Sequence, residues 1–210
     1  MKLIKQITLI GFALILLSSC AKIFYSPDAY TLAHNQKTIA IIPPTVSIAA
    51  RKKVDAEAIK EQQKTESINF QKEMYSWMLK RKMQGKILQE IQALETTNAK
   101  LKKAGYPKTP LTTSELCEIL DVDGIMTSNY QLSKPMSDGV AVALVLLAGA
   151  YGSTNEVHVS LSINDCNNKK LIWNYDHKFS GSLGSSPARL VDGIMRKASK
   201  KMPYMIQTTY

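Results

Sequence analysis

The residue types that support acid–base, nucleophilic or metal chemistry are scattered along this chain. Its three histidines, His34, His158 and His177, stand apart from any run of cysteines or carboxylates at metal-ligand spacing. Ser185 and Ser186 follow a Gly-Ser-Leu-Gly segment that lacks the pattern of a nucleophile elbow, and the sequence contains no Gly-rich phosphate-binding loop. We therefore predict no catalytic residues, no metal site, no cofactor and no small-molecule substrate, and we expect that the protein is not an enzyme.

Cys117 and Cys166 leave two interpretations open. An oxidising compartment permits a disulfide between them, but two cysteines far apart in a sequence do not by themselves form a disulfide framework. Cys117 occupies an apolar helical position in Glu-Leu-Cys-Glu-Ile-Leu, where a buried thiol is common, and Cys166 lies in a polar turn. The sequence does not decide whether they pair.

The third cysteine, Cys20, has a more specific context. It follows Leu17, Ser18 and Ser19, an aliphatic residue and two small ones. This segment resembles the lipobox of bacterial lipoproteins. The resemblance implies that the small residues let a signal peptidase reach the backbone, and that the Cys20 thiol accepts a diacylglycerol.

The residues before this segment resemble a secretory signal peptide. Lys2 and Lys5 precede an apolar run over residues 7–17. That run matches the core of a signal peptide and is shorter than the roughly 20 residues that a membrane-spanning helix needs. An uncleaved anchor is the alternative. We expect residues 1–19 to be a signal peptide and residues 20–36 to be a lipidated tether.

Lipid on Cys20, with acyl chains such as palmitate, would attach the protein to a membrane. Ala21 follows the cysteine, and by resemblance to known sorting rules this suggests the outer membrane, facing the periplasm.

Charge is concentrated in one part of the chain. Without Lys2 and Lys5 the formal charge is +8, and residues 51–103 carry 13 Lys and Arg against 7 Asp and Glu. An exported, tethered protein rarely meets nucleic acid, so we predict no nucleic-acid partner and favour anionic lipid head groups or an acidic protein face. A solvated helix face that happens to be basic is the alternative.

Hydrophobic patterning predicts a single α/β domain over residues 37–205. A buried strand over 37–42 ends at Pro43-Pro44. A long helical segment over 54–104 follows, with apolar residues at spacings of three and four. The apolar positions of the segment are Phe70, Met74, Trp77, Met78, Met83, Ile87, Ile91 and Leu94.

In the second half of the domain, the residue pattern predicts one more helix, three strands and a closing helix. Thr112 or Thr113 can cap the helix, and a strand follows over 125–132. Alternating residues over 157–163 and 171–179 predict a β-hairpin with one buried face, which includes Leu171 and holds His158 and His177 as possible cross-strand neighbours. The closing helix covers about 187–202, with Ser186 as its cap. The predicted fold is α/β, in an α+β variant, with one mixed sheet flanked by helices in the order β-α-α-β-(apolar insert)-β-β-α.

Three short segments resemble one group of envelope proteins: residues 39–44, 120–125 and 170–173. The group includes the curli-secretion lipoprotein CsgG, the N-terminal domain of TolB and the lipoprotein LpoB. The resemblance covers roughly residues 37–202 and implies an α/β fold and work in envelope assembly without an active site. This sequence departs from the group in its long helical segment and in an apolar insert.

The apolar insert, residues 139–152, is the most unusual stretch after Cys20. Eleven of its residues, 140–150, are apolar or small, which is too few to span a bilayer as a helix. Three interpretations stay open: a buried core element, a docking or self-association surface, and a membrane-dipping element. The candidate interaction residues are Val140, Val142, Leu144, Leu146 and Leu147.

These features predict a lipid-anchored accessory protein of the cell envelope that binds another envelope protein or itself. The alternative is a homo-oligomeric secretion pore subunit that resembles the curli-secretion lipoprotein. The long helical segment and the apolar insert are the predicted contact surfaces.

Overall fold

The computed structural model describes residues 21–49, 55–133, 156–180 and 186–206. In these ranges a seven-stranded mixed sheet has the strand order β1-β7-β6-β5-β2-β4, and β3 pairs with β5 beside β2. The strands are β1 Lys22–Tyr25, β2 Thr38–Ile41, β3 Thr45–Ile48, β4 Glu90–Ile91, β5 Gly124–Leu132, β6 Glu156–Asp165 and β7 Lys170–Ser180. The helices in these ranges are α2 Ala29–Asn35, α3 Ala56–Met83, α4 Leu94–Lys103, α5 Thr113–Leu120, α7 Pro187–Ala198 and the 3-10 helix η2 Ser199–Lys201. The predicted α/β class with a single mixed sheet is confirmed.

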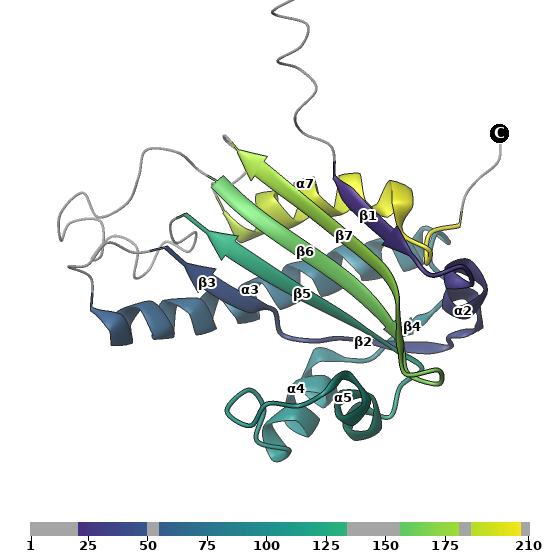
Figure 1. The fold of residues 1–210 in the computed structure, drawn as a ribbon, viewed down its shortest axis with the longest axis horizontal. Coiled ribbons are helices and arrows are strands. Elements are labelled where there is room, and N and C mark those ends of the chain that lie inside the picture. The colour runs from purple at the N-terminus through teal and green to yellow at the C-terminus, as the bar shows by residue number, and fades with distance from the viewer. Residues whose placement is uncertain (1–20, 50–54, 134–155, 181–185, 207–210) are drawn as a thin grey trace, which may run out of the picture.

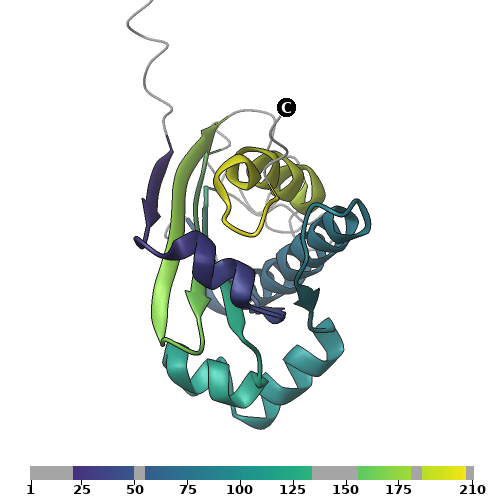
Figure 2. The ribbon, with the colours of Figure 1, turned by 90° about the vertical axis from the view of Figure 1, so that its right-hand side faces the viewer.

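Helices α3 and α7 cover one face of the sheet, and α4 and α5 lie at the end where β2 runs, packed against the other face (Figures 1 and 2). The larger core lies under α3 and α7, where Phe70 stacks on Tyr130 with ring centroids 4.3 Å apart. A smaller core gathers Ala40, Ile42 and Ile125 against α4 and α5. Both faces of the sheet centre are therefore packed, which explains why Ile39, Ala40 and Ile41 of β2 are consecutive apolar residues.

The predicted hairpin is confirmed, with one correction. Val157, Val159, Leu161 and Ile163 of β6 are all buried on the α3–α7 side. The register between β6 and β7 shifts between Ile163 and Asn164. Such an irregularity changes which side chains face the core, so the prediction that Leu171 points inward is wrong: Leu171 is 39% exposed.

The predicted tether over residues 20–36 is wrong for the part that the structure describes. Strand β1 pairs antiparallel with β7, so it forms an edge of the sheet. Ala29 and Ala33 of α2 are buried in the larger core, and Lys170 Nζ lies 2.6 Å from Asp28 Oδ2 just before α2. The four residues of β1 were too few to show a clear period, which is why the sequence did not reveal them.

The helical segment over 54–104 is not continuous, because Gly85 ends α3 and strand β4 separates it from α4. Gly85 follows α3 with φ +68°, and its N–H donates to Lys82 O while Lys86 N–H donates to Arg81 O. Gly105 ends α4 in the same way with φ +83°. This is the Schellman arrangement, in which glycine takes the left-handed conformation that other residues avoid. Met83, predicted to be in the apolar stripe, lies on the last turn of α3 and is 89% exposed.

The predicted N-terminal caps of the later helices are confirmed. Thr112 caps α5, and a reciprocal bond from its backbone N–H to Glu115 completes a capping box. Ser186 caps α7, with Pro187 in the first turn. Asp123 Oδ2 accepts the backbone N–H groups of Lys37 and Thr38, each at 2.9 Å, so this carboxylate caps backbone donors.

Candidate docking groove

An apolar groove of about 510 Å³ lies between α3, α4 and the bend that joins β2 to β3. The groove is lined by Pro43, Pro44, Thr45, Val46, Gln63, Lys64, Ser67, Ile68, Asn98, Leu101, Lys102, Tyr106 and Pro107. We call it the α3–α4 groove. It lies along the helical segment that the sequence predicted as a contact surface.

Hydrogen bonds to backbone fix the position of the α3–α4 groove walls. Ser67 Oγ donates to Pro44 O at 2.6 Å, which ties the middle of α3 to the bend. Gln71 Nε2 donates to Ile41 O at 2.8 Å and to Asn98 Oδ1 at 2.9 Å, and Asn98 Nδ2 returns a bond to Gln71 Oε1 at 2.9 Å. The reciprocal amide pair holds α3 and α4 at a set spacing, so the groove is preformed.

The surface of the α3–α4 groove is apolar in its middle and basic at its rim. Ile68 and Tyr106 are half-buried there, and burial raises the pKa of the Tyr106 hydroxyl above 10. Lys64 and Lys102 are exposed at the rim. Lys64 has Glu61 at 3.8 Å, and both side chains of this pair are exposed, so the pair is weak. The groove therefore suits an apolar segment that carries carboxylates beside it.

Beyond α4 and α5, no element that the structure describes covers the face of the sheet opposite α3 and α7, and we call this part the uncovered face. A shallow hollow of about 580 Å³ lies over β5, β6 and β7 and is lined mainly by polar side chains. Asn174 Nδ2 donates to Ser160 Oγ and Ser162 Oγ, both at 3.0 Å, and Lys178 Nζ lies 2.6 Å from Glu156 Oε1. Lys178 and, after it, His158 lower the pKa of the Glu156 carboxyl. These groups bond to one another, which makes this face less suited to an apolar partner than the α3–α4 groove.

The histidines do not converge on one site. His158 pairs in register with Lys178 on the uncovered face, and His177 pairs with Val159 and faces α7. His177 Nε2 lies 3.4 Å from Lys197 Nζ. Burial, and then the Lys197 charge, lower the pKa of His177 below 6.5. The part of the chain that the structure describes contains no group of three or more His, Cys, Asp or Glu placed to hold a metal ion.

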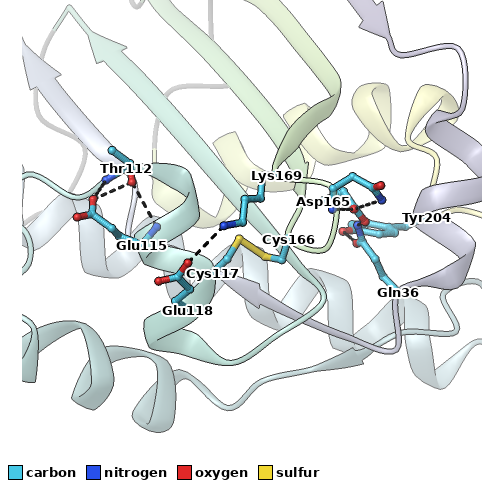
Figure 3. Close-up of a disulfide and its surroundings, with 10 residues drawn as sticks. Gln36, Thr112, Glu115, Cys117, Glu118, Asp165, Cys166, Lys169 and Tyr204 are labelled. Atoms are coloured by element: carbon cyan, nitrogen blue, oxygen red, sulfur yellow. Dashed lines mark hydrogen bonds and ion pairs between the residues drawn. A yellow bond between two sulfur atoms is a disulfide. The ribbon is translucent and has the colours of Figure 1, made fainter.

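Cys117 and Cys166 form a disulfide, which settles the question that the sequence left open (Figure 3). It joins α5 to the turn between β6 and β7, and its Cα atoms are 5.5 Å apart. Lys169 of that turn reaches Glu118 of α5, with Nζ and Oε1 3.5 Å apart. The strand-to-strand turn is thereby attached to the layer that carries the α3–α4 groove wall.

The other predicted site residues lie outside the described residues. These are the lipidation residue Cys20 with Leu17, Ser18 and Ser19, and the candidate interaction residues Val140, Val142, Leu144, Leu146 and Leu147 of the insert over 139–152. Among the helices that the structure describes, none has the length and apolar character needed to cross a bilayer. The sequence did not reveal the α3–α4 groove, because its lining comes from four separate segments. Two of these segments, Pro43-Pro44 and Tyr106-Pro107, were recognisable only as chain reversals.

No protein-family model matches the chain, and no curated protein matches its sequence. Among solved structures, the chain is similar to the lipoprotein GNA1162 of Neisseria meningitidis, with a TM-score of 0.43 and 12% identity over 79% of this chain and 96% of that one. It is similar to a PelC dodecamer subunit of Paraburkholderia phytofirmans, with a TM-score of 0.42 and 9% identity over 90% and 99% of the two chains. It is also similar to the LpoB C-terminal domain of Salmonella enterica, with a TM-score of 0.31 and 8% identity over 73% and 95%. The resemblance to CsgG and to the TolB N-terminal domain stays a prediction.

Proposed function

We propose that this protein is a lipid-anchored accessory protein of the cell envelope that binds another envelope protein through the α3–α4 groove and works by binding, not by catalysis. The observation that carries the proposal is the preformed apolar groove with lysines at its rim. The lipobox-like segment that ends at Cys20 supports attachment to a membrane. The Cys117–Cys166 disulfide supports an oxidising compartment outside the cytoplasm. We further propose that the membrane is the outer membrane and that the domain faces the periplasm.

The partner is expected to present an apolar segment with acidic residues beside it. The apolar side chains would occupy the space beside Ile68 and Tyr106, and the carboxylates would meet Lys64 and Lys102. Binding energy would come mainly from the apolar contact, whereas the lysines would speed association and make it dependent on salt.

A photocrosslinking side chain in place of Tyr106, in the full chain produced in its own cells, tests this proposal. We expect one discrete protein to become attached there. Ile68→Glu places a charge in the groove and should abolish the crosslink. Ser76→Glu adds the same charge at an exposed position of α3 outside the groove and should leave it unchanged. If both variants retain the crosslink, or if no protein is captured, the α3–α4 groove is not the docking site.

A further inference from the structure

The C-terminal ends of α3 and α7 lie together and carry a concentration of positive charge. A groove of about 410 Å³ between them is lined by Arg81, Lys86, Arg196, Lys197, Ser199, Lys200 and Met205. We call it the basic groove. Basic residues at a helix C-terminus favour the helix dipole, but this effect explains charges on the last turns of each helix and not Lys86, which follows α3 beyond Gly85.

The basic groove is weakly neutralised by the side chains that surround it. Among its five cations, the described residues place a carboxylate within ion-pair distance of Arg196, where Asp192 Oδ2 lies 2.7 Å from Nε. Arg81 stacks over the Trp77 ring at 4.6 Å and donates to Gln84 Oε1 at 2.7 Å. Lys86 and Lys200 are exposed. Several cations are thus available to an external anion.

An apolar hollow adjoins the basic groove. It measures about 720 Å³ and is lined by Tyr30, His34, Leu88, Met205 and Ile206, so that Met205 lines both depressions. Leu88 is 67% exposed and Ile206 is 39% exposed. Elements that lie in a membrane interface combine exposed apolar side chains with basic ones, as this surface does.

The path of the chain places this surface on the side of the lipid anchor. One residue, Ala21, separates Cys20 from β1. In Figures 1 and 2, β1 and α7 both lie in the upper part of the molecule, whereas α4 and α5 lie in the lower part. The Tyr25 hydroxyl at the end of β1 donates to Lys201 O of η2 at 2.6 Å, which attaches the entering strand to the basic end of α7 and η2.

We propose that the basic groove binds the phosphate-bearing head groups of an anionic bilayer while Leu88 and Ile206 enter its interface. This inference rests on the lipid anchor of the proposed function and goes beyond it, because it gives the domain a second contact with lipid and a fixed orientation. An anchor with one intervening residue keeps this side of the domain at the bilayer surface, where basic side chains are attracted to anionic lipid. In this orientation the α3–α4 groove, on the other side of α3, stays open to a protein partner.

The test uses the mature lipoprotein reconstituted in vesicles, with an environment-sensitive fluorophore on Leu88→Cys. Cys20 is acylated and the other two cysteines are paired, so the introduced thiol is the one that reacts. We expect a blue shift, and quenching by a head-group quencher, in vesicles that contain phosphatidylglycerol. The signal should fall at about 1 M salt, where the screening length is about 3 Å. A probe on Lys108→Cys, an exposed position beyond α4, should not respond.

Charge reversal identifies the residues responsible. Lys86→Glu with Lys200→Glu should reduce the docked-to-undocked ratio of the Leu88 probe by at least about fivefold for each charge lost. Lys103→Glu with Lys108→Glu makes the same change in net charge on the α4 side and should leave the ratio unchanged. A ratio equally reduced by both pairs would overturn the proposal, since net charge alone would then govern the contact.

Two further outcomes would also overturn it. One is a Leu88 probe that reports the same environment in phosphatidylcholine vesicles with and without phosphatidylglycerol. The other is a probe that responds in neutral vesicles when an acidic envelope protein is added, because the basic groove would then be a protein-binding surface. Flotation of the protein with neutral vesicles reports the lipid anchor separately, so failure of the anchor is distinguishable from failure of the basic groove.

Discussion

Three side chains from distant parts of the chain form a buried hydrogen-bonded series under one end of the sheet (Figure 3). The Tyr204 hydroxyl donates to Gln36 Oε1 at 2.5 Å, and Gln36 Nε2 donates to Asp165 Oδ1 at 2.8 Å. Burial, and then the charges of Asp165 and Asp123, raise the pKa of Tyr204 well above 10, so the hydroxyl keeps its proton. The series connects the residues after η2 to those before β2 and to the β6–β7 turn. A Cβ at Gly124 would overlap Gln36 Oε1, so this glycine is required for space.

Tyr204→Phe is expected to lower the free energy of unfolding by about 1–3 kcal/mol, because Gln36 Oε1 loses its donor in a buried site. Urea unfolding measures the change. Tyr30→Phe removes a hydroxyl from a side chain that is 39% exposed and should change stability by less than about 0.5 kcal/mol. If the two substitutions lower the free energy of unfolding equally, the buried series stabilises the fold no more than the exposed Tyr30 hydroxyl does.

His177 is expected to make stability depend on pH. Its pKa in the fold is below 6.5, first because of burial and then because of Lys197. Between the folded and the unfolded pKa the unfolded chain binds more protons, so stability rises with pH. The contribution is complete above pH 6.5 and declines as the pH falls below it. The stability difference between wild type and His177→Gln, from urea unfolding at several pH values, should therefore change below pH 6.5.

Helices and strands differ in how well the sequence revealed them. The hairpin and the caps of α5 and α7 were predictable, because alternation and capping residues are local signals that the fold retains. Strands β1 and β3, each of four residues, and β4, of two, depend on pairing with distant strands, which local patterns do not record. Leu171 was misassigned because a register shift reversed its face, and α3 was overextended because apolar spacing continued past Gly85.

The disulfide holds α5 to the β6–β7 turn across a sequence separation of 49 residues. Closing a loop of that length lowers the entropy of the unfolded chain, and loss of the bond is expected to cost about 2–4 kcal/mol. The double variant Cys117→Ala with Cys166→Ala, compared with wild type in urea, measures this cost. A reductant should destabilise wild type by a similar amount and leave the double variant unaffected. If reductant changes neither protein, the bond does not contribute to stability.

The proposed membrane anchor would determine how the whole domain is presented, because only Ala21 separates Cys20 from the edge strand β1. Cys20→Ser removes the thiol that would accept lipid. We expect that this variant accumulates as an unprocessed precursor or leaves the membrane fraction, which fractionation and mass spectrometry measure. Ser19→Ala keeps a small residue before the cysteine and should be processed normally. Normal processing and membrane retention of Cys20→Ser would refute the lipoprotein assignment.

Native mass after extraction in mild detergent decides between the accessory function and the secretion-pore alternative at the level of the whole assembly. The α3–α4 groove is built within one chain and is suited to a segment of another protein, so we expect one chain, or a complex with a different envelope protein. A pore would require a closed ring of many copies, which would bury the same surfaces in every subunit. If the extract contains a homogeneous ring of this chain alone, the pore becomes the better interpretation. Ile68→Glu then separates the two cases. It should dissociate a different protein that binds in the α3–α4 groove, and it should not affect a ring whose contacts lie outside the groove.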